Sequence, residues 1–223
     1  NDELTQLIYQ CFNKLISNYY SNTKDVMKDL FSITISHFED TKKFQYALEF
    51  WGNVALTEKE IDIKEKNYHY ILGVIPLIVE QYIFPFIYIS SPNIYDENNP
   101  EDDKPVFENL SEECLQSISL AEPSYMFEIL SRYFDEHKSD PRWEIRLSAL
   151  ISYRCILKSF NKDENFEDEN QTIYKFIENS INFIMEFAKG ANEKLKYYAL
   201  SIINIILKKL PSFIMSNRDI IND

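Results

Sequence analysis

One short stretch, KSDPRWEIR at residues 138–146, carries the pattern that decides the fold. It joins two segments in which apolar residues return at helical spacing, and its proline marks the boundary between them. Asp140 suits the position before a helix, because its carboxylate can accept the unpaired N–H groups of the first turn. Arg146 lies nearly two turns into the second helix, from where it can reach a preceding turn. The stretch predicts two tightly joined helices, with Asp140 and Arg146 as structural contacts.

Other short polar turns, at 39–40 and 189–191, separate segments with the same apolar period. Helices are expected over residues 4–20, 23–38, 41–56, 63–88 with a kink at Pro76, 110–120, 123–136, 141–159, 171–188 and 192–210. Paired antiparallel helices that repeat every roughly 40 to 50 residues are typical of HEAT or armadillo repeats. In HEAT repeats an aspartate and an arginine at this spacing commonly form a ladder between successive repeats. The sequence therefore predicts an all-α, right-handed HEAT-repeat solenoid.

The expected helix pairs form a single array. Residues 1–21 would be the second helix of one repeat, and further repeats would follow at 22–60, 61–120, 121–160 and 171–212. The repeat at 61–120 contains an acidic loop at 91–107. The chain begins at Asn1 rather than at methionine, so we expect a fragment of a longer superhelix.

Composition and charge limit the possible functions. The chain has 223 residues, 36 Asp and Glu against 23 Lys and Arg, a formal net charge of −13, and only three glycines. Scarce glycine disfavours a turn-rich β fold. The negative charge disfavours nucleic acid and anionic membranes, because phosphate binding needs a basic surface. Basic protein segments are the natural partners, although excess acid that serves only solubility explains the charge equally well.

We expect no catalysis, metal or cofactor. The three histidines fall on different helices at no metal-ligand spacing, and neither a Gly-rich phosphate loop nor a GxSxG motif is present. The apolar run 71–90 is interrupted by Glu80 and two prolines, which favours a buried helix over a membrane span. An odd, scattered set of cysteines is typical of reduced core residues. These are Cys11, Cys114 and Cys155.

The most acidic segment is DENNPEDD at residues 96–103. Nothing in it is apolar enough to pack, so it predicts a solvated loop. A calcium loop is excluded, because Glu101 stands where that motif needs glycine and Pro100 takes a ligand position. Its acidic residues are Asp96, Glu97, Glu101, Asp102 and Asp103. Their composition leaves open whether the loop is filler or a contact surface.

Two segments resemble the importin-β (karyopherin-β) family of nuclear transport receptors. Residues 47–54, ALEFWGNV, resemble the family's EFWSNV helix. Residues 143–146, WEIR, and 154–158, RCILK, resemble its WRYR…GCILEG helix. The family also has an acidic loop between these two helices. The resemblance covers nearly the whole chain, and the order of the motifs is more specific than any one of them.

The resemblance implies a monomeric segment from the central repeats of a receptor that shuttles between cytoplasm and nucleus through the nuclear envelope. Implied partners are the GTPase Ran, an importin-α-type adaptor or other basic cargo, and FG nucleoporins, without nucleic acid or membrane insertion. The acidic loop would contact Ran. Glu49 matches a glutamate that faces the adaptor's basic segment, and Asn53 lies one turn further along the same face. Glu58 would substitute for a family aspartate replaced here by Leu56.

Two alternatives stay open. Transportin, another karyopherin, shares an EFW helix, but its loop at this place is much longer and its match to residues 155–157 is poorer. A HEAT-repeat scaffold of another kind, such as a phosphatase regulatory subunit, would hold protein complexes together without transport. Binding to Ran would distinguish a transport receptor from a scaffold.

Overall fold

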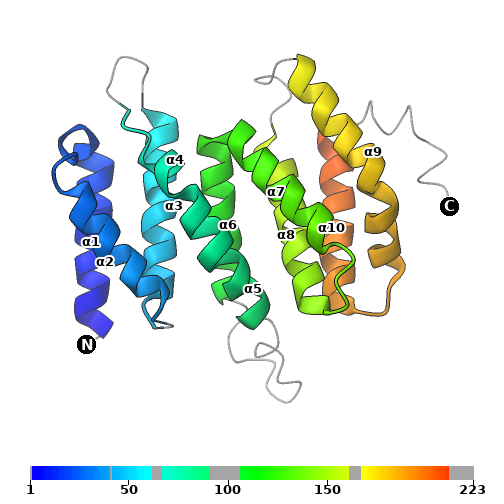
Figure 1. Ribbon diagram of the computed structural model, residues 1–223, viewed down its shortest axis with the longest axis horizontal. Coiled ribbons are helices and arrows are strands. Elements are labelled where there is room, and N and C mark those ends of the chain that lie inside the picture. The colour runs from blue at the N-terminus through cyan, green and yellow to red at the C-terminus, as the bar shows by residue number, and fades with distance from the viewer. Residues whose placement is uncertain (1, 41, 62–66, 91–105, 161–166, 211–223) are drawn as a thin grey trace. The chain divides into compact units, whose positions relative to one another are not determined.

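The computed structural model describes residues 2–40, 42–61, 67–90, 106–160 and 167–210, and within these ranges every regular element is helical. The chain divides into two compact units, Asn1–Pro123 (unit 1) and Ser124–Asp223 (unit 2). Figure 1 shows the helices of each unit in chain order.

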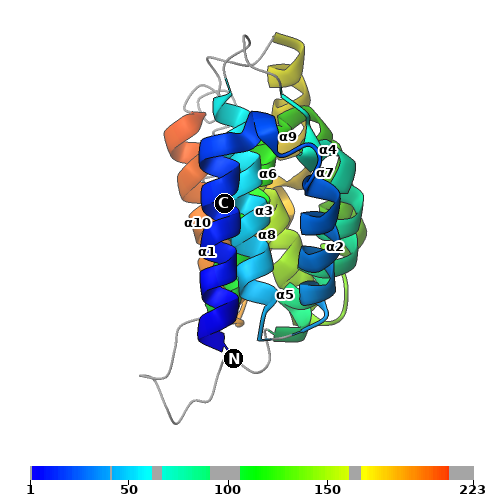
Figure 2. The same cartoon turned by 90° about the vertical axis from the view of Figure 1, so that its left-hand side faces the viewer.

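Unit 1 is built from two layers of helices. Its elements are α1 (Asp2–Tyr19), the 3₁₀ turn η1 (Tyr20–Asn22), α2 (Met27–Phe38), α3 (Phe44–Glu60), α4 (Tyr70–Ile75), the π-helical segment η2 (Pro76–Ile83), α5 (Phe84–Ser90) and α6 (Val106–Ala121). Helix α3 packs between α1 and α6 in one layer, while α2 and the α4–η2–α5 segment form the other (Figure 2). Each helix of the first layer thus has an apolar side turned toward the second layer.

The helix expected over 63–88 differs from the one observed. It begins at Tyr70, and residues 62–66 lie outside the described residues. The kink predicted at Pro76 takes the form of the π-helical segment η2. Proline has no N–H to donate and its ring crowds the carbonyl one turn earlier, so the regular ladder cannot continue through it.

Residues Tyr70–Ile87 are the one described stretch that is long and apolar enough to cross a membrane by length and composition alone. Of this stretch, 44% is buried inside the protein. Helices α4 and η2 contact α6, and α4 also contacts α3. Core helices commonly meet the same length and composition criteria, so the stretch is weak evidence for a membrane span.

Trp51 lies at the centre of the core of unit 1. Its side chain is 0% exposed, and its indole Nε1 donates a hydrogen bond of 3.1 Å to Thr34 Oγ1 of α2. The rings of Phe31 and Phe50 pack against it edge-on. The next residue, Gly52, faces Cys114 and Ser117 of α6. Trp51 is therefore part of the core between α2 and α3.

Unit 2 contains α7 (Pro123–His137), α8 (Trp143–Ser159), α9 (Glu167–Lys189) and α10 (Glu193–Lys209). Residues 147–157 of α8 are all buried, so this helix is covered on every side. The ring of Tyr153 packs against Phe134 of α7 and Phe176 of α9, with centroids 4.9 Å apart in both pairs. The helix expected over 171–188 begins earlier, at Glu167, so the last four residues of the acidic stretch 161–170 belong to the first turn of α9.

Three turns between helices share one device. In each, a side-chain oxygen accepts a hydrogen bond from the backbone N–H two residues later, which fixes the turn. Only Asn192 is itself the N-cap residue of the helix that follows. The pairs are Asp40 with Lys42 at 3.0 Å, Asp140 with Arg142 at 2.9 Å and Asn192 with Lys194 at 3.1 Å. Asp140 lies in the turn before α8, but the N-cap residue is Arg142, so Asp140 accepts an N–H of the turn and does not cap the helix as expected.

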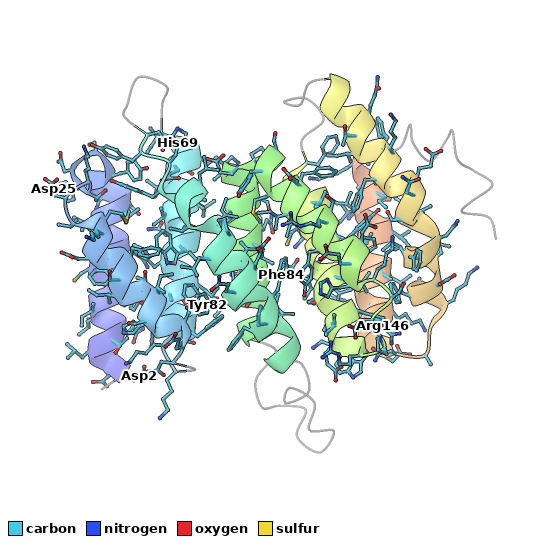
Figure 3. All side chains as sticks on the ribbon, viewed as in Figure 1. Asp2, Asp25, His69, Tyr82, Phe84 and Arg146 are labelled. Carbon is cyan, nitrogen blue, oxygen red and sulfur yellow. The ribbon has the colours of Figure 1, made fainter. Side chains whose placement is uncertain are left out.

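The expected ladder between successive repeats, in which Arg146 reaches the preceding repeat's turn, is not seen among the described residues. The carboxylate of Asp140 also binds the guanidinium of Arg142, at 3.1 and 3.2 Å. The Nε atom of Arg146 is buried and has no hydrogen-bond partner within the described part of the chain. Figure 3 shows Arg146 near the start of α8. A contact between Arg146 and a preceding turn stays a prediction, because residues 91–105 lie outside the described ranges.

The cysteines differ in exposure. Cys114 and Cys155 are buried, as expected, and burial raises the pKa of the Cys114 thiol to about 12. Cys11 is exposed, which corrects its expected place in the core. Cys11 belongs to the apolar stripe of α1 that includes Leu4, Leu7 and Ile8. The described helices leave this side of α1 uncovered, so Cys11 is exposed with it.

Candidate polar interface of unit 1

A set of polar side chains lies across the layer formed by α1, α3 and α6, and we call it the polar face. Its members are Asn13 and Ser17 of α1, Glu49 and Asn53 of α3, and Glu113 and Ser117 of α6. Helix packing gives this arrangement, since residues four apart share one side of a helix. The three helices are neighbours in the layer.

Hydrogen bonds fix the α1–α3 half of the polar face. Asn53 Nδ2 donates to the backbone carbonyl of Asn13 and to Ser17 Oγ, both at 3.2 Å. Ser17 Oγ lies 3.3 Å from Asn53 Oδ1, to which it can donate. Asn53 is therefore present on the expected face, but part of its hydrogen-bonding capacity is used to hold α1 against α3.

The α3–α6 half carries two carboxylates, Glu49 and Glu113, which are close enough for the charge of one to act on the other. Glu49 is exposed, as the sequence predicted, and so is Glu113. Partial burial raises the pKa of Glu49, and the negative charge of Glu113 raises it further. No ion-pair partner of either carboxylate is found in the described ranges. Two like charges held together in this way favour a bound cation or a proton.

Glu58 is not part of this surface, which corrects its expected position on the concave face. Its side chain is 5% exposed, and its carboxylate accepts hydrogen bonds from Tyr20, Tyr70 and Ile71. Burial raises the pKa of Glu58, while these donors act to lower it. Glu49 and Glu58 are nine residues apart, about two and a half helical turns, so they lie on opposite sides of α3.

The acidic residues expected to contact a partner, at 96–103, lie outside the described residues. Sequence reasoning also missed Glu113. Its spacing from Ser117 suggests a shared side of a helix, but the pairing of α6 with α3 cannot be read from the sequence. In the part of the chain that the structure describes, no group of three or more His, Cys, Asp or Glu is placed to hold a metal ion.

Helix pairs joined by turns that begin with Asp or Asn define an α-helical repeat protein of the HEAT type. No family model matches the sequence, and no curated protein matches it. Solved structures do match. A chain of the structure of Kap95p with RanGDP and one of the Kap95:Nup1 complex each match 96% of this chain, at a TM-score of 0.77 and 17% identity. Yeast importin-β (Kap95p) matches 92%, at a TM-score of 0.74 and 17% identity.

The match confirms the predicted all-α HEAT-repeat solenoid and shows an importin-β-like fold. This chain spans about a quarter of the length of those matched chains, at 25%, 24% and 24%. Sequence identity at this level shows the fold alone.

Proposed function

We propose that this chain is a segment of an importin-β-like nuclear transport receptor and that its polar face binds a basic segment of another protein. The observation that carries the proposal is the pair Glu49 and Glu113, two carboxylates on adjacent helices of an importin-β-like fold. The net charge of −13 favours the same class of partner. The proposal assigns no catalytic role to the chain.

The mechanism would be electrostatic. A lysine or arginine side chain placed between Glu49 and Glu113 would relieve their mutual repulsion, which lets each carboxylate remain ionised. Ser117 Oγ donates its proton to the backbone carbonyl of Glu113 at 2.9 Å, so towards the bound segment it could accept a backbone N–H. Because the carboxylates are exposed, salt would screen the attraction and weaken binding.

Replacing Glu49 and Glu113 together by glutamine is expected to weaken binding of a lysine- and arginine-rich peptide by about three- to tenfold at low salt, since exposed ion pairs contribute roughly 0.2–1 kcal/mol each. Fluorescence anisotropy of a labelled peptide at two salt concentrations measures the effect. Glu128→Gln with Glu186→Gln is the matched control, because both residues are exposed and lie in unit 2. Equal weakening in both double variants would show that only net charge matters, and the polar face would then not be the site.

The further partners of the proposed receptor are Ran, an importin-α-type adaptor or basic cargo, and FG nucleoporins, and its proposed location is the cytoplasm, nucleus and nuclear envelope. The known structures support this choice, since one contains Kap95p with RanGDP and another Kap95 with Nup1. The acidic loop would contribute negative charge to the Ran contact. Its proposed residues are Asp96, Glu97, Glu101, Asp102 and Asp103.

Neutralising these five acidic residues in the full-length protein is expected to weaken binding to Ran·GTP by about tenfold and to reduce its salt dependence, because the contact rests on charge. Surface plasmon resonance with Ran·GTP and Ran·GDP provides the measurement. The stretch 161–170 offers a control with an equal change in charge, because it also holds five acidic residues. These are Asp163, Glu164, Glu167, Asp168 and Glu169. Absent or equal binding of the two Ran states by the unaltered protein would favour a scaffold function instead.

A further inference from the structure

The buried carboxylate of Glu58 joins three elements of unit 1. It lies in the last turn of α3. Glu58 Oε1 accepts from the hydroxyl of Tyr20 in η1 at 2.6 Å and from the backbone N–H of Tyr70 at 2.6 Å. Glu58 Oε2 accepts from the backbone N–H of Ile71 at 3.2 Å. One side chain therefore holds the end of α3, the turn after α1 and the start of α4 together.

These contacts supply the cap that α4 lacks in its own sequence. The residue before α4, His69, provides no side-chain cap and has a left-handed backbone, with φ 52° and ψ 44°. The N–H groups of a first helical turn have no partner within the helix, and a negative charge near them is favourable. Glu58 meets both needs from the neighbouring helix. Figure 3 shows His69 where α4 begins.

A second set of hydrogen bonds closes the same region. Asn67 Nδ2 donates to the backbone carbonyl of Glu58 at 3.1 Å, and Asn67 Oδ1 accepts from the N–H of His69 at 2.8 Å. The hydroxyl of Tyr20 accepts from the N–H of Tyr68 at 3.0 Å. The side chains of Glu58, Tyr20 and Asn67 thus hold the backbone from Tyr68 to Ile71.

We propose that Glu58, Tyr20 and Asn67 form a latch that makes η1, the end of α3 and the start of α4 open and close as one unit. While the latch is closed, the left-handed backbone at His69 is held and the first turn of α4 is protected. Once the Glu58 contacts are lost, η1, the end of α3 and the start of α4 can open while the rest of α3 and α6 stays folded. The latch is a conformational device, and it does not depend on the proposed function of the polar face.

Native-state hydrogen exchange tests the latch. In Glu58→Ala, protection of the Tyr70 and Ile71 amides is expected to fall about tenfold or more, because both lose their acceptor. Protection in the middle of α6 should fall by a smaller factor, since that helix has no contact with the carboxylate. Val54→Ala is the matched control, because Val54 is buried in the same helix. It should lower the protection of the Tyr70 and Ile71 amides by no more than that of the α6 amides.

A milder variant keeps the test decisive if Glu58→Ala does not fold. Tyr20→Phe removes a single hydroxyl, and it should lower protection of Tyr68 and Tyr70 more than that of α6. Glu60→Gln, an exposed change two residues along α3, should leave all of these amides unchanged. Equal loss of protection at α4 and α6 in the Glu58 or Tyr20 variant would overturn the latch, as would no loss at either place.

Discussion

Replacing Trp51 by alanine is expected to lower the free energy of unfolding by about 3–5 kcal/mol, the largest effect among substitutions in unit 1. The indole is 0% exposed and sits between α2 and α3, where its loss leaves a cavity that the packed helices cannot fill. The change also leaves Thr34 Oγ1 without the donor that it has now. Urea unfolding followed by far-UV circular dichroism measures the effect without relying on tryptophan fluorescence.

Trp143→Ala is the control for this prediction. Trp143 begins α8 and is only partly buried, so its removal is expected to cost clearly less, about 1–2 kcal/mol. Trp51→Phe should fall between these values, because it keeps most of the apolar volume but loses the hydrogen bond to Thr34. If Trp51→Ala lowered the free energy of unfolding by less than Trp143→Ala does, the central position of Trp51 in the core would be contradicted.

Replacing Tyr153 by alanine is expected to have a similar effect in unit 2, about 3–5 kcal/mol. The ring is 0% exposed and contacts both Phe134 and Phe176, so its removal opens the junction of α7, α8 and α9. The phenol hydroxyl accepts a hydrogen bond of 3.0 Å from Ser180 Oγ, and burial raises its pKa well above the usual range. Chemical denaturation of the variant and the unaltered chain gives the difference.

Tyr153→Phe distinguishes the contribution of the ring to stability from that of the hydroxyl. It is expected to cost about 1 kcal/mol or less, because Ser180 Oγ also lies within 2.5 Å of the Phe176 carbonyl and retains that acceptor. Most of the loss in free energy of unfolding in Tyr153→Ala should therefore come from the removal of the ring. If phenylalanine destabilised the protein as much as alanine, the hydrogen bond rather than aromatic packing would hold this junction.

Most of the helices could be predicted from the sequence, because apolar period and turn residues act locally. The boundaries of the segment after α3 could not. The helix was expected to start near Ile63, but it starts at Tyr70, where Glu58 supplies an acceptor from another helix. A cap provided by a distant residue leaves no signal in the local sequence.

Helix α1 shows a second limit. Its sequence has a clear apolar stripe, yet Leu4, Leu7 and Ile8 are 56%, 57% and 40% exposed, while Tyr9 and Ile16 are buried. Helical period identifies which residues share a side, but it does not say which neighbour covers that side. The position of the stripe was predictable, and its exposure was not.

For the candidate interface, the sequence alone identified the exposed Glu49, the polar turn at Asp140, the excess of negative charge and the helical repeat. Glu49 was identified by the family resemblance, and the others follow from local spacing or from composition. Only the tertiary structure decided that the charge of Glu113 acts on Glu49 and that Glu58 is buried as a cap. The reason is that both outcomes depend on how α3 packs against α6, α4 and η1, and contacts between residues far apart in the chain are set by packing rather than by local period.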